Sequence, residues 1–240
     1  MHKKKLTGKI TIVVGGASAI GMGIVRTLLI ENATVIVPSS NADDISRLKN
    51  YTADILTGGL ITLPTDVADY DKATNIAGAI QQRFGKIDLV VTALNNGQSD
   101  TPLTEMEITD WQKMMDENIS LYFMSGRISL HLMKEQDSGV FINVCDADLF
   151  LHRPNSPLAR ITTESQVKLS LIFSEEIAPF NISFYHLFVN SVDASAPEMI
   201  GHHIVKLYLG KVEDPEKLFQ HLLGSPLPAK NVASFYPPLL

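Results

Sequence analysis

The chain is poor in the features that mark several classes of protein. Cys145 is the only cysteine among 240 residues, which excludes an internal disulfide and a cysteine-rich metal site and fits a reducing compartment. Basic residues are outnumbered, because 20 lysines and arginines stand against 26 aspartates and glutamates, a net charge of −6. The only basic tract covers residues 3–5, so nucleic acid is not an expected partner. We expect a cytoplasmic protein without a metal site.

One segment lacks charge almost entirely. Residues 10–30 contain Arg26 as their only charged side chain, and a run of this length could be a membrane anchor or a signal peptide. Several glycines within residues 15–23 argue against both, and no second hydrophobic span or small-residue cleavage site follows. We therefore expect no association with a membrane.

The same segment has the pattern of a strand, a turn and a helix. Residues 10–14 are apolar and mostly β-branched, small residues follow, and Ile20, Ile24 and Leu28 recur at helical spacing. A glycine-rich turn at a helix N-terminus brings unpaired N–H groups and the positive end of the helix dipole together, which suits a phosphate. A small-residue turn can also be a packing solution alone, so both interpretations stay open at this point.

Four small residues of this segment have three expected roles. Gly15 allows the tight turn, and Ala19 and Gly21 lack the bulk that would hold a pyrophosphate away. Gly23 is expected to let the helix lie close on the sheet.

Strand and helix patterns alternate along the rest of the chain. Further strands are expected at residues 33–38, 60–63, 87–92, 140–145 and 182–189, with a seventh at 232–236. Helices are expected at residues 43–56, 70–84, 110–134, 163–178, 199–209 and 215–223. This alternation predicts an α/β fold, a Rossmann-type doubly wound parallel sheet of about seven strands with helices on both faces. We expect a single domain, 1–240, whose segment from about 190 to 240 diverges from the regular pattern.

Several landmarks, taken in order, resemble the short-chain dehydrogenase/reductase family over about residues 6–190. The turn within residues 8–21 looks like the cofactor turn of the family, with Ala19 in place of its middle glycine. Asp66 and Val67 look like the pair that reads the adenine ring, Asp66 by its carboxylate and Val67 by its backbone.

Three later landmarks complete the resemblance. Trp111 with Asn118 is similar to the long helix that carries the structural and catalytic asparagine of the family. Residues 139–146 look like the strand that normally ends in two serines, and residues 176–182 resemble the segment entering the sixth strand.

The resemblance implies NAD or NADP as a cofactor. Its expected binding residues are Gly15, Ser18, Ala19, Ile20, Gly21, Ser39, Asp66 and Val67. Two landmarks have other interpretations, since Asp66 could cap a helix and Asn118 could be a satisfied polar residue inside a buried helix.

The acid–base pair of the family is missing. Its chemistry needs a tyrosine that exchanges a proton with the substrate oxygen, and a lysine four residues later that lowers the tyrosine pKa and holds the nicotinamide ribose. Counting back from Glu176 places Ala159 at the tyrosine position and Thr163 at the lysine position. Counting forward from Asp146 gives the same tyrosine position. None of the 6 tyrosines is followed by lysine at the fourth residue.

Asp146 stands at the serine position, so Asn118 is the only one of the usual catalytic residues that is retained. An ionised carboxylate cannot donate a hydrogen bond to a carbonyl and would repel a developing oxyanion. Positioned acid–base groups contribute about 10² to 10⁴ in rate, so the usual carbonyl reduction should be severely impaired or absent.

The cofactor site also departs from the family. The second strand ends in Ser39 and Ser40, where an acid would select NAD or an arginine NADP. Val14 replaces a threonine, and residues 92–95 replace the family's Asn-Asn-Ala-Gly, from which we hypothesise a repacked structural link. Residues 189–190 replace the family's Pro-Gly, which puts the loop over the nicotinamide in doubt.

Three hypotheses follow. The first is a catalytically silent relative that binds a dinucleotide or another small molecule. The second is an oxidoreductase with relocated chemistry, supplied by Asp146, Asp148, His152 or Arg160. The third is a structural subunit of a homo-oligomer, a dimer or tetramer, which would pair through the helices expected at 110–134 and 163–178.

Overall fold

The computed structural model describes residues 4–94, 100–146, 156–189 and 196–210. Within these ranges it has one parallel sheet of six strands in the order β3-β2-β1-β4-β5-β6. The strands are β1 (Ile10–Val14), β2 (Thr34–Ser39), β3 (Gly59–Pro64), β4 (Leu89–Thr92), β5 (Gly139–Asp146) and β6 (Ile182–Val189). The predicted doubly wound α/β fold is therefore confirmed. The strand expected at 232–236 and the helix expected at 215–223 lie outside the described residues.

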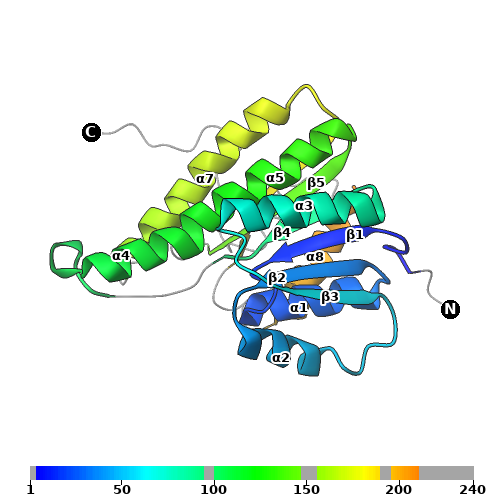
Figure 1. Ribbon diagram of the computed structural model, residues 1–240, viewed down its shortest axis with the longest axis horizontal. Helices are drawn as coiled ribbons and strands as arrows, with labels where there is room; N and C mark the ends of the chain where they lie inside the picture. Colours follow the sequence, from blue (N-terminus) through cyan, green and yellow to red (C-terminus); the bar gives the residue numbers. More distant parts are fainter. Residues whose placement is uncertain (1–3, 95–99, 147–155, 190–195, 211–240) are drawn as a thin grey trace.

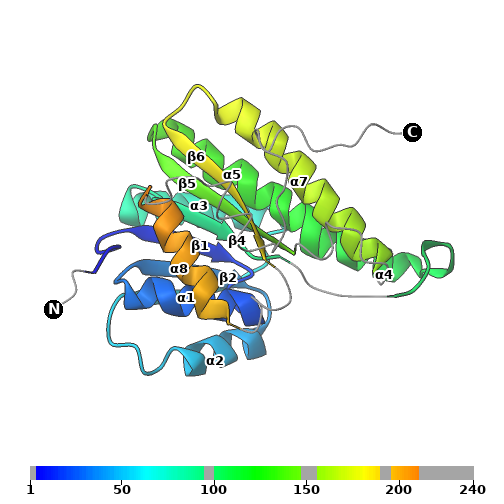
Figure 2. The ribbon, with the colours of Figure 1, turned by 180° about the vertical axis from the view of Figure 1, so that it is seen from behind.

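Helices cover both faces of the sheet. On one face lie α1 (Ala19–Ile30) and α8 (Pro197–Tyr208), with α2 (Ala42–Tyr51) beside α1 (Figure 2). On the other face lie α3 (Tyr70–Phe84), α5 (Leu121–Glu135) and α7 (Pro157–Ile177) (Figure 1). A 3₁₀ turn η1 (Leu103–Glu105), the helix α4 (Ile108–Met114) and a π-helical turn η2 (Met115–Ser120) lead into α5.

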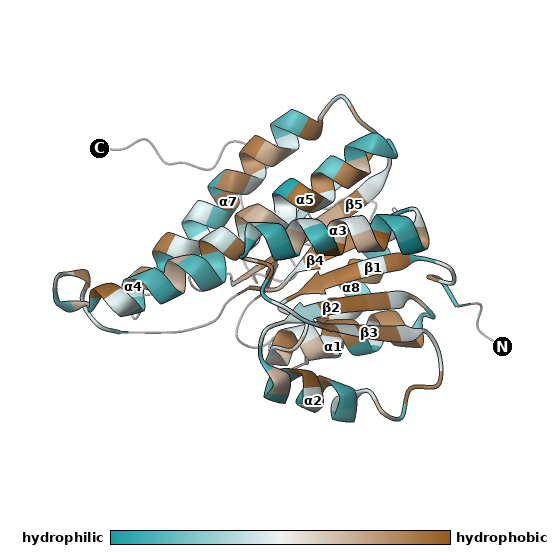
Figure 3. Ribbon diagram, in the orientation of Figure 1, coloured by the Kyte–Doolittle hydropathy of each residue, from teal (hydrophilic) through white to brown (hydrophobic). Residues whose placement is uncertain are grey.

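Burial explains why these segments form strands. Every residue of β1 and of β4 is buried, as expected for central strands that carry apolar side chains on both faces. Figure 3 shows the apolar strands enclosed by helices that carry both apolar and polar residues. Two apolar layers result, one between the sheet and α1 and α8, the other between the sheet and α3, α5 and α7.

Several predicted boundaries were wrong. The helix expected from 163 begins at Pro157, because proline is tolerated in the first helical turn. The single helix expected at 110–134 begins at Ile108 and is interrupted by the π turn η2. The helix expected at 43–56 ends at Tyr51. Gly85, predicted to close α3, does so in a left-handed conformation with φ +70°.

The strand order fixes where a ligand would bind. The chain moves outward from β1 to β3 on one side and, after β4, outward to β6 on the other, so the switch point lies between β1 and β4. In open α/β sheets ligands bind beyond the carboxyl ends of the strands at this point. The glycine turn follows β1 there. In the described part of the chain, no helix has the length and apolar character needed to cross a membrane.

Candidate nucleotide-binding edge and catalytic positions

The turn after β1 has a conformation that requires glycine. Gly15 has φ +76°, a left-handed value that disfavours other residues. A Cβ at this position would also lie 2.4 Å from the carbonyl oxygen of Ala93, just beyond β4. The turn is thus held closely against the end of the neighbouring strand at the switch point.

The first turn of α1 is tied back to this glycine turn. Ser18 caps the helix, and its Oγ accepts a hydrogen bond from the Gly21 N–H at 3.1 Å. The Ser18 N–H donates to the Gly15 carbonyl oxygen at 3.0 Å. A Cβ at Gly21 would lie 2.0 Å from that same oxygen. Gly21 therefore lets the helix begin against the turn, a packing role that the sequence pattern did not reveal.

The role predicted for Gly23 was wrong. A Cβ there would lie 2.4 Å from the Cβ of Pro197 and 2.8 Å from the backbone nitrogen of Glu198. Gly23 thus allows α8 to cross α1 closely, and it does not serve contact with the sheet. The next helical turn carries the same crossing, where Gly201 faces Thr27.

The strand ends beside the turn carry the other predicted nucleotide contacts. Ser39, the last residue of β2, accepts a hydrogen bond at Oγ from the Asn41 N–H at 3.3 Å. The carboxylate of Asp66 is exposed and accepts from the Ala68 N–H at 2.9 Å. Asp69 rather than Asp66 caps α3, so the capping interpretation of Asp66 was wrong.

Asn118 lies inside the π turn that separates α4 from α5. Such turns are rare and frequently occur at functional sites. The Asn118 side chain is 1% exposed, and its Nδ2 donates to the Met114 carbonyl oxygen at 3.1 Å. From α7, Gln166 Nε2 donates to the Asn118 carbonyl oxygen at 3.3 Å. The retained asparagine thus joins α7 to the π turn.

The tyrosine and lysine positions fall on α7 as buried small residues. Ala159 is 2% exposed and Thr163 is 3% exposed. α7 contains no tyrosine, and Lys168, the only lysine of this helix, is exposed. Asp146 is the last residue of β5. Asp148 and His152 lie outside the described residues.

Two tyrosines deserve comparison with the missing one. Tyr122 on α5 is fully buried, hydrogen-bonds Ser170 on α7, and burial raises the pKa of its phenol. Tyr208, the second of these tyrosines, raises the pKa of Lys9 together with Asp88. Lys9 precedes β1, so this tyrosine and lysine lie at the amino edge of the sheet. Neither tyrosine is therefore an acid–base group at the carboxyl edge.

A line of buried polar side chains crosses three strands below that edge. Thr92 Oγ1 donates to Asn143 Oδ1 at 2.7 Å, and Asn143 Nδ2 donates to Cys145 Sγ at 3.1 Å. The Cys145 sulfur lies 3.8 Å from His186 Nδ1. Burial lowers the pKa of His186 to about 4, so its imidazole is neutral near pH 7.

This line was missed from the sequence, although polar residues inside apolar strands were a visible signal. Thr92 lies opposite Val14 of β1 in the strand register, but its hydroxyl hydrogen-bonds Asn143 of β5 on the other side. That arrangement supports the hypothesis of a repacked link at these positions. Within the described ranges, no three His, Cys, Asp or Glu side chains gather as a metal ion would require.

Comparisons with known proteins agree with this architecture. Residues 9–156 match the family model described as short chain dehydrogenase. An uncharacterized oxidoreductase of Staphylococcus aureus (strain N315) is 26% identical over 190 residues, which are 79% of this chain and 80% of that protein. 3β-hydroxysteroid dehydrogenase 2 of Eggerthella lenta is 27% identical over 143 residues, 59% of this chain and 55% of that protein.

Solved structures show the same fold at lower identity. A metagenomic short-chain oxidoreductase in complex with NADP has a TM-score of 0.73 at 18% identity, over 85% of this chain and 91% of that one. A short chain dehydrogenase from Mycobacterium smegmatis has a TM-score of 0.76 at 17% identity, over 88% of this chain and 91% of that one.

Proposed function

This chain belongs to the short-chain dehydrogenase family, and we propose that it binds a dinucleotide at the glycine turn while lacking the acid–base pair for the family's usual carbonyl reduction. It is then a nucleotide-binding relative whose usual catalysis is silent or severely impaired. The observation that carries this proposal is a contrast at the carboxyl edge. Gly15 holds the turn in a left-handed conformation that disfavours other residues, whereas the tyrosine and lysine positions on α7 are the buried residues Ala159 and Thr163.

The residues around the turn fit a pyrophosphate. The first N–H groups of an α-helix have no carbonyl partner. The Gly21 N–H goes to Ser18 Oγ and the Met22 N–H to the Ser18 carbonyl oxygen, which leaves the N–H groups of Ala19 and Ile20 for a phosphate oxygen. The positive end of the α1 dipole adds to this attraction.

The rest of the nucleotide would lie along the neighbouring strand ends. Asp66 and Val67 would hold the adenine, and Ser39 the ribose. Ser39 is neither the acid expected for NAD nor the arginine expected for NADP, so both are candidates. When bound, such a cofactor supplies a hydride donor or acceptor.

The absent proton relay is the reason to expect no usual turnover. Neither alanine nor threonine titrates near neutral pH, and Tyr122, the buried tyrosine that contacts α7, has a raised pKa. A phenol with a raised pKa is a poor acid–base group at pH 7. Asn118, though retained, uses its Nδ2 within its own helix.

Calorimetric titration with NAD, NADH, NADP and NADPH tests the proposal, together with turnover assays on a panel of carbonyls and alcohols. We expect binding of at least one nucleotide and no turnover. Absence of binding by all of them would remove the first half of the proposal, and robust ketone reduction by the pure protein would remove the second. Gly78→Ala is the control variant: Gly78 lies on α3 with no atom near its added Cβ, so the variant should fold and bind nucleotide as the wild type does.

A second candidate is relocated chemistry, favoured by one feature of α7. Arg160 follows Ala159; its Nε is buried and has no hydrogen-bond partner among the described residues, and its guanidinium lies 3.9 Å from Glu164. A cation at this position could hold an anionic substrate for acid–base groups at Asp146, Asp148 or His152. Turnover that is lost in Asp146→Asn or His152→Gln, with nucleotide binding kept, would support it.

A third candidate, compatible with the first, is assembly into a homo-oligomer through α5 and α7. Phe123 stacks on Phe173 with ring centres 6.2 Å apart, and Phe123 and Ile172 are 41% and 45% exposed. Light scattering after size exclusion should then give a dimer or tetramer that Ile172→Glu shifts toward monomer. A monomer in both the wild-type protein and the Ile172→Glu variant would exclude this face as an interface between copies.

A further inference from the structure

The segments that follow β1, β2 and β3 lie side by side at the carboxyl edge of the sheet. A Cβ at Gly16 would lie 2.9 Å from Val37 Cγ1, so the glycine turn is held against β2. The Ser39 carbonyl oxygen accepts a hydrogen bond from the Thr65 N–H at 3.0 Å, which joins the end of β2 to the loop after β3. The three segments therefore form one continuous edge.

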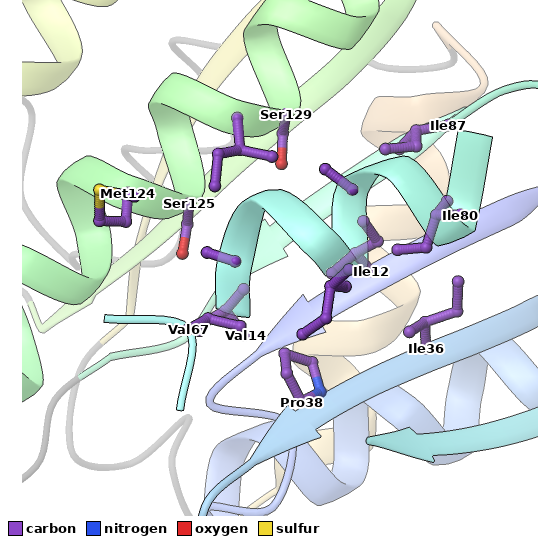
Figure 4. A pocket seen from close by; sticks show the side chains of 14 residues that line it. Ile12, Val14, Ile36, Pro38, Val67, Ile80, Ile87, Met124, Ser125 and Ser129 are labelled. Atoms are coloured by element: carbon purple, nitrogen blue, oxygen red, sulfur yellow. The ribbon is translucent and has the colours of Figure 1, made fainter. Parts of the chain in front are cut away.

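Side chains from all three strand ends line the same space. Val14 of β1, Pro38 of β2 and Val67 of the loop after β3 line a largely apolar pocket between α3, α5 and the sheet (Figure 4). Ligands of open α/β sheets bind beyond the carboxyl ends of the strands. A nucleotide on the glycine turn would therefore also meet residues 38–44 and 64–69.

The charge of this edge is negative. Residues 15–21, 38–44 and 64–69 contain no lysine, arginine or histidine, and their charged residues are all aspartates: Asp43, Asp44, Asp66 and Asp69. The basic residues on the following helices pair with two of them, since Arg47 bonds Asp44 and Lys72 Nζ lies 3.2 Å from Asp69. Nothing in these three segments could therefore compensate an added negative charge.

The start of α2 differs from the start of α1 in its suitability for a phosphate. Asn41 Oδ1 accepts from the N–H groups of Asp43 at 2.9 Å and Asp44 at 3.4 Å, and the Asn41 carbonyl oxygen accepts from the Ile45 N–H at 3.2 Å. These helical N–H groups are thus already used. The first turn of α2 also carries two carboxylates, whereas that of α1 carries none, and negative charge there opposes an anion.

We propose that the nucleotide site prefers NAD(H) to NADP(H), and that Asp43 and Asp44 are specificity-determining residues which disfavour the second. This preference rests on the proposed binding of a dinucleotide at the glycine turn. NADP carries a further phosphate on its adenosine ribose, which an arginine near the end of the second strand accommodates in Rossmann folds. A phosphate monoester has a charge of about −1.5 to −2 at pH 7.

Ser39 can serve a ribose hydroxyl but not that phosphate. Its own hydroxyl is neutral, and its Oγ already accepts from the Asn41 N–H at 3.3 Å. Phosphate recognition in proteins relies on charge-assisted hydrogen bonds from arginine or lysine. Because the edge supplies none and adds carboxylates, we expect NADPH to bind about tenfold more weakly than NADH.

Calorimetric titration of the full chain with NADH and with NADPH tests the preference. Tighter binding of NADH by about tenfold is the expected result. Equal or tighter binding of NADPH would overturn the preference while leaving the proposed nucleotide binding intact. Binding of neither would overturn the proposed nucleotide binding, and the preference with it.

Two variants test the assigned cause. The double variant Asp43→Asn, Asp44→Asn removes the carboxylates of α2 and should narrow the ratio of the two affinities about threefold, mainly by strengthening NADPH. Ser40→Arg places a cation on the exposed residue after β2 and should strengthen NADPH about tenfold with little change for NADH.

Glu107→Gln with Asp110→Asn is the matched control. It removes the same charge from the start of α4, which lies away from α2 in both views (Figures 1 and 2), and should keep the wild-type ratio. Far-ultraviolet circular dichroism checks the folding of each variant. A ratio that stays at the wild-type value in both test variants, or that shifts equally in the control, would overturn the role of these charges.

Discussion

The glycine turn after β1 and the helix pair α5–α7 flank the same edge of the sheet but are built differently. At the turn, backbone groups approach so closely that an added Cβ at Gly15 or Gly21 would lie 2.4 Å or 2.0 Å from a carbonyl oxygen. Between α5 and α7, polar side chains bond one another and the helix backbone: the Tyr122 hydroxyl donates to Ser170 Oγ, and Ser170 Oγ donates to the Gln166 carbonyl oxygen.

This difference explains how one half of a site can persist without the other. A phosphate cradle made of backbone N–H groups depends on conformation and on small residues. Proton transfer depends on particular side chains with suitable pKa values. Side chains such as Ala159 and Thr163 can occupy α7 without disturbing the turn, because the two regions share no hydrogen bond among those found in the described residues.

The largest expected effect concerns the α7 side of the sheet and its buried histidine. The pKa of His186 falls from 6.5 to about 4 on burial. Between these values the unfolded chain binds more protons, so the free energy of unfolding decreases as the pH is lowered. We expect a loss of about 3 kcal/mol between pH 7 and pH 4, measured by urea unfolding.

His186→Phe is the control for that loss. The variant should lose less stability over the same pH window by about the contribution of His186, because Phe cannot titrate and fits between Phe184 and Phe188. The pKa values of Asp88 and Glu31 are lowered, so their contribution begins to be lost below about pH 5, and to the same extent in the variant and the wild type. An equal slope in variant and wild type would show that His186 is not the group responsible.

On the turn side, Gly21→Ala should lower the free energy of unfolding by about 2.5 kcal/mol, because its Cβ would collide with backbone that cannot move freely. Gly78→Ala, with open space around its Cβ, should raise it by about 0.5–1 kcal/mol through helix propensity. Denaturant unfolding measures both. Similar effects of the two substitutions would contradict the close approach at the turn.

Comparing Ser18→Ala with Asn41→Ala separates the effect of a lost helix cap on stability from an effect on nucleotide binding. Removing the cap of α1 should cost about 1 kcal/mol of unfolding free energy and also weaken nucleotide affinity. Asn41 caps α2 by accepting from Asp43 and Asp44, so Asn41→Ala should cost about the same and leave affinity unchanged. Chemical unfolding and calorimetry check the pair, and loss of affinity in both variants would argue against a phosphate site at α1.

Tyr122→Phe is expected to have the smallest effect. Ser170 keeps its hydrogen bond to the Gln166 carbonyl oxygen at 2.7 Å, so the variant should lose only about 0.5–1 kcal/mol. Nucleotide affinity should not change, since the phenol is buried away from the edge. A change in any measured turnover would reveal a catalytic role for Tyr122 that its raised pKa argues against.

The patterns in the sequence were sufficient for the fold and for the turn. Apolar runs, helical spacing and glycine positions predicted all six described strands and the sequence of helices between them. Boundaries were less accurate where local signals compete. The proline at 157 begins α7 although a polar stretch precedes it, and η2 interrupts a helix whose apolar spacing continues across it.

Contacts between distant segments were beyond the sequence. The role of Gly23 depends on Pro197, and the line from Thr92 to His186 depends on the register of β4, β5 and β6. No local pattern encodes which side chains a sheet register brings face to face. The pocket under α3 likewise is lined by residues of different helices, such as Ala77 on α3 and Ser129 on α5.

The sequence by itself determined the parallel α/β fold, the glycine turn and the lack of a Tyr-x-x-x-Lys pair, because each is a matter of local conformation or of residue identity. Only the tertiary structure decided that Ala159 and Thr163 are buried, that Gly21 supports the turn and Gly23 a helix crossing, and that an apolar pocket lies under α3. These depend on how close separate elements come, and that distance is set by packing across the whole sheet.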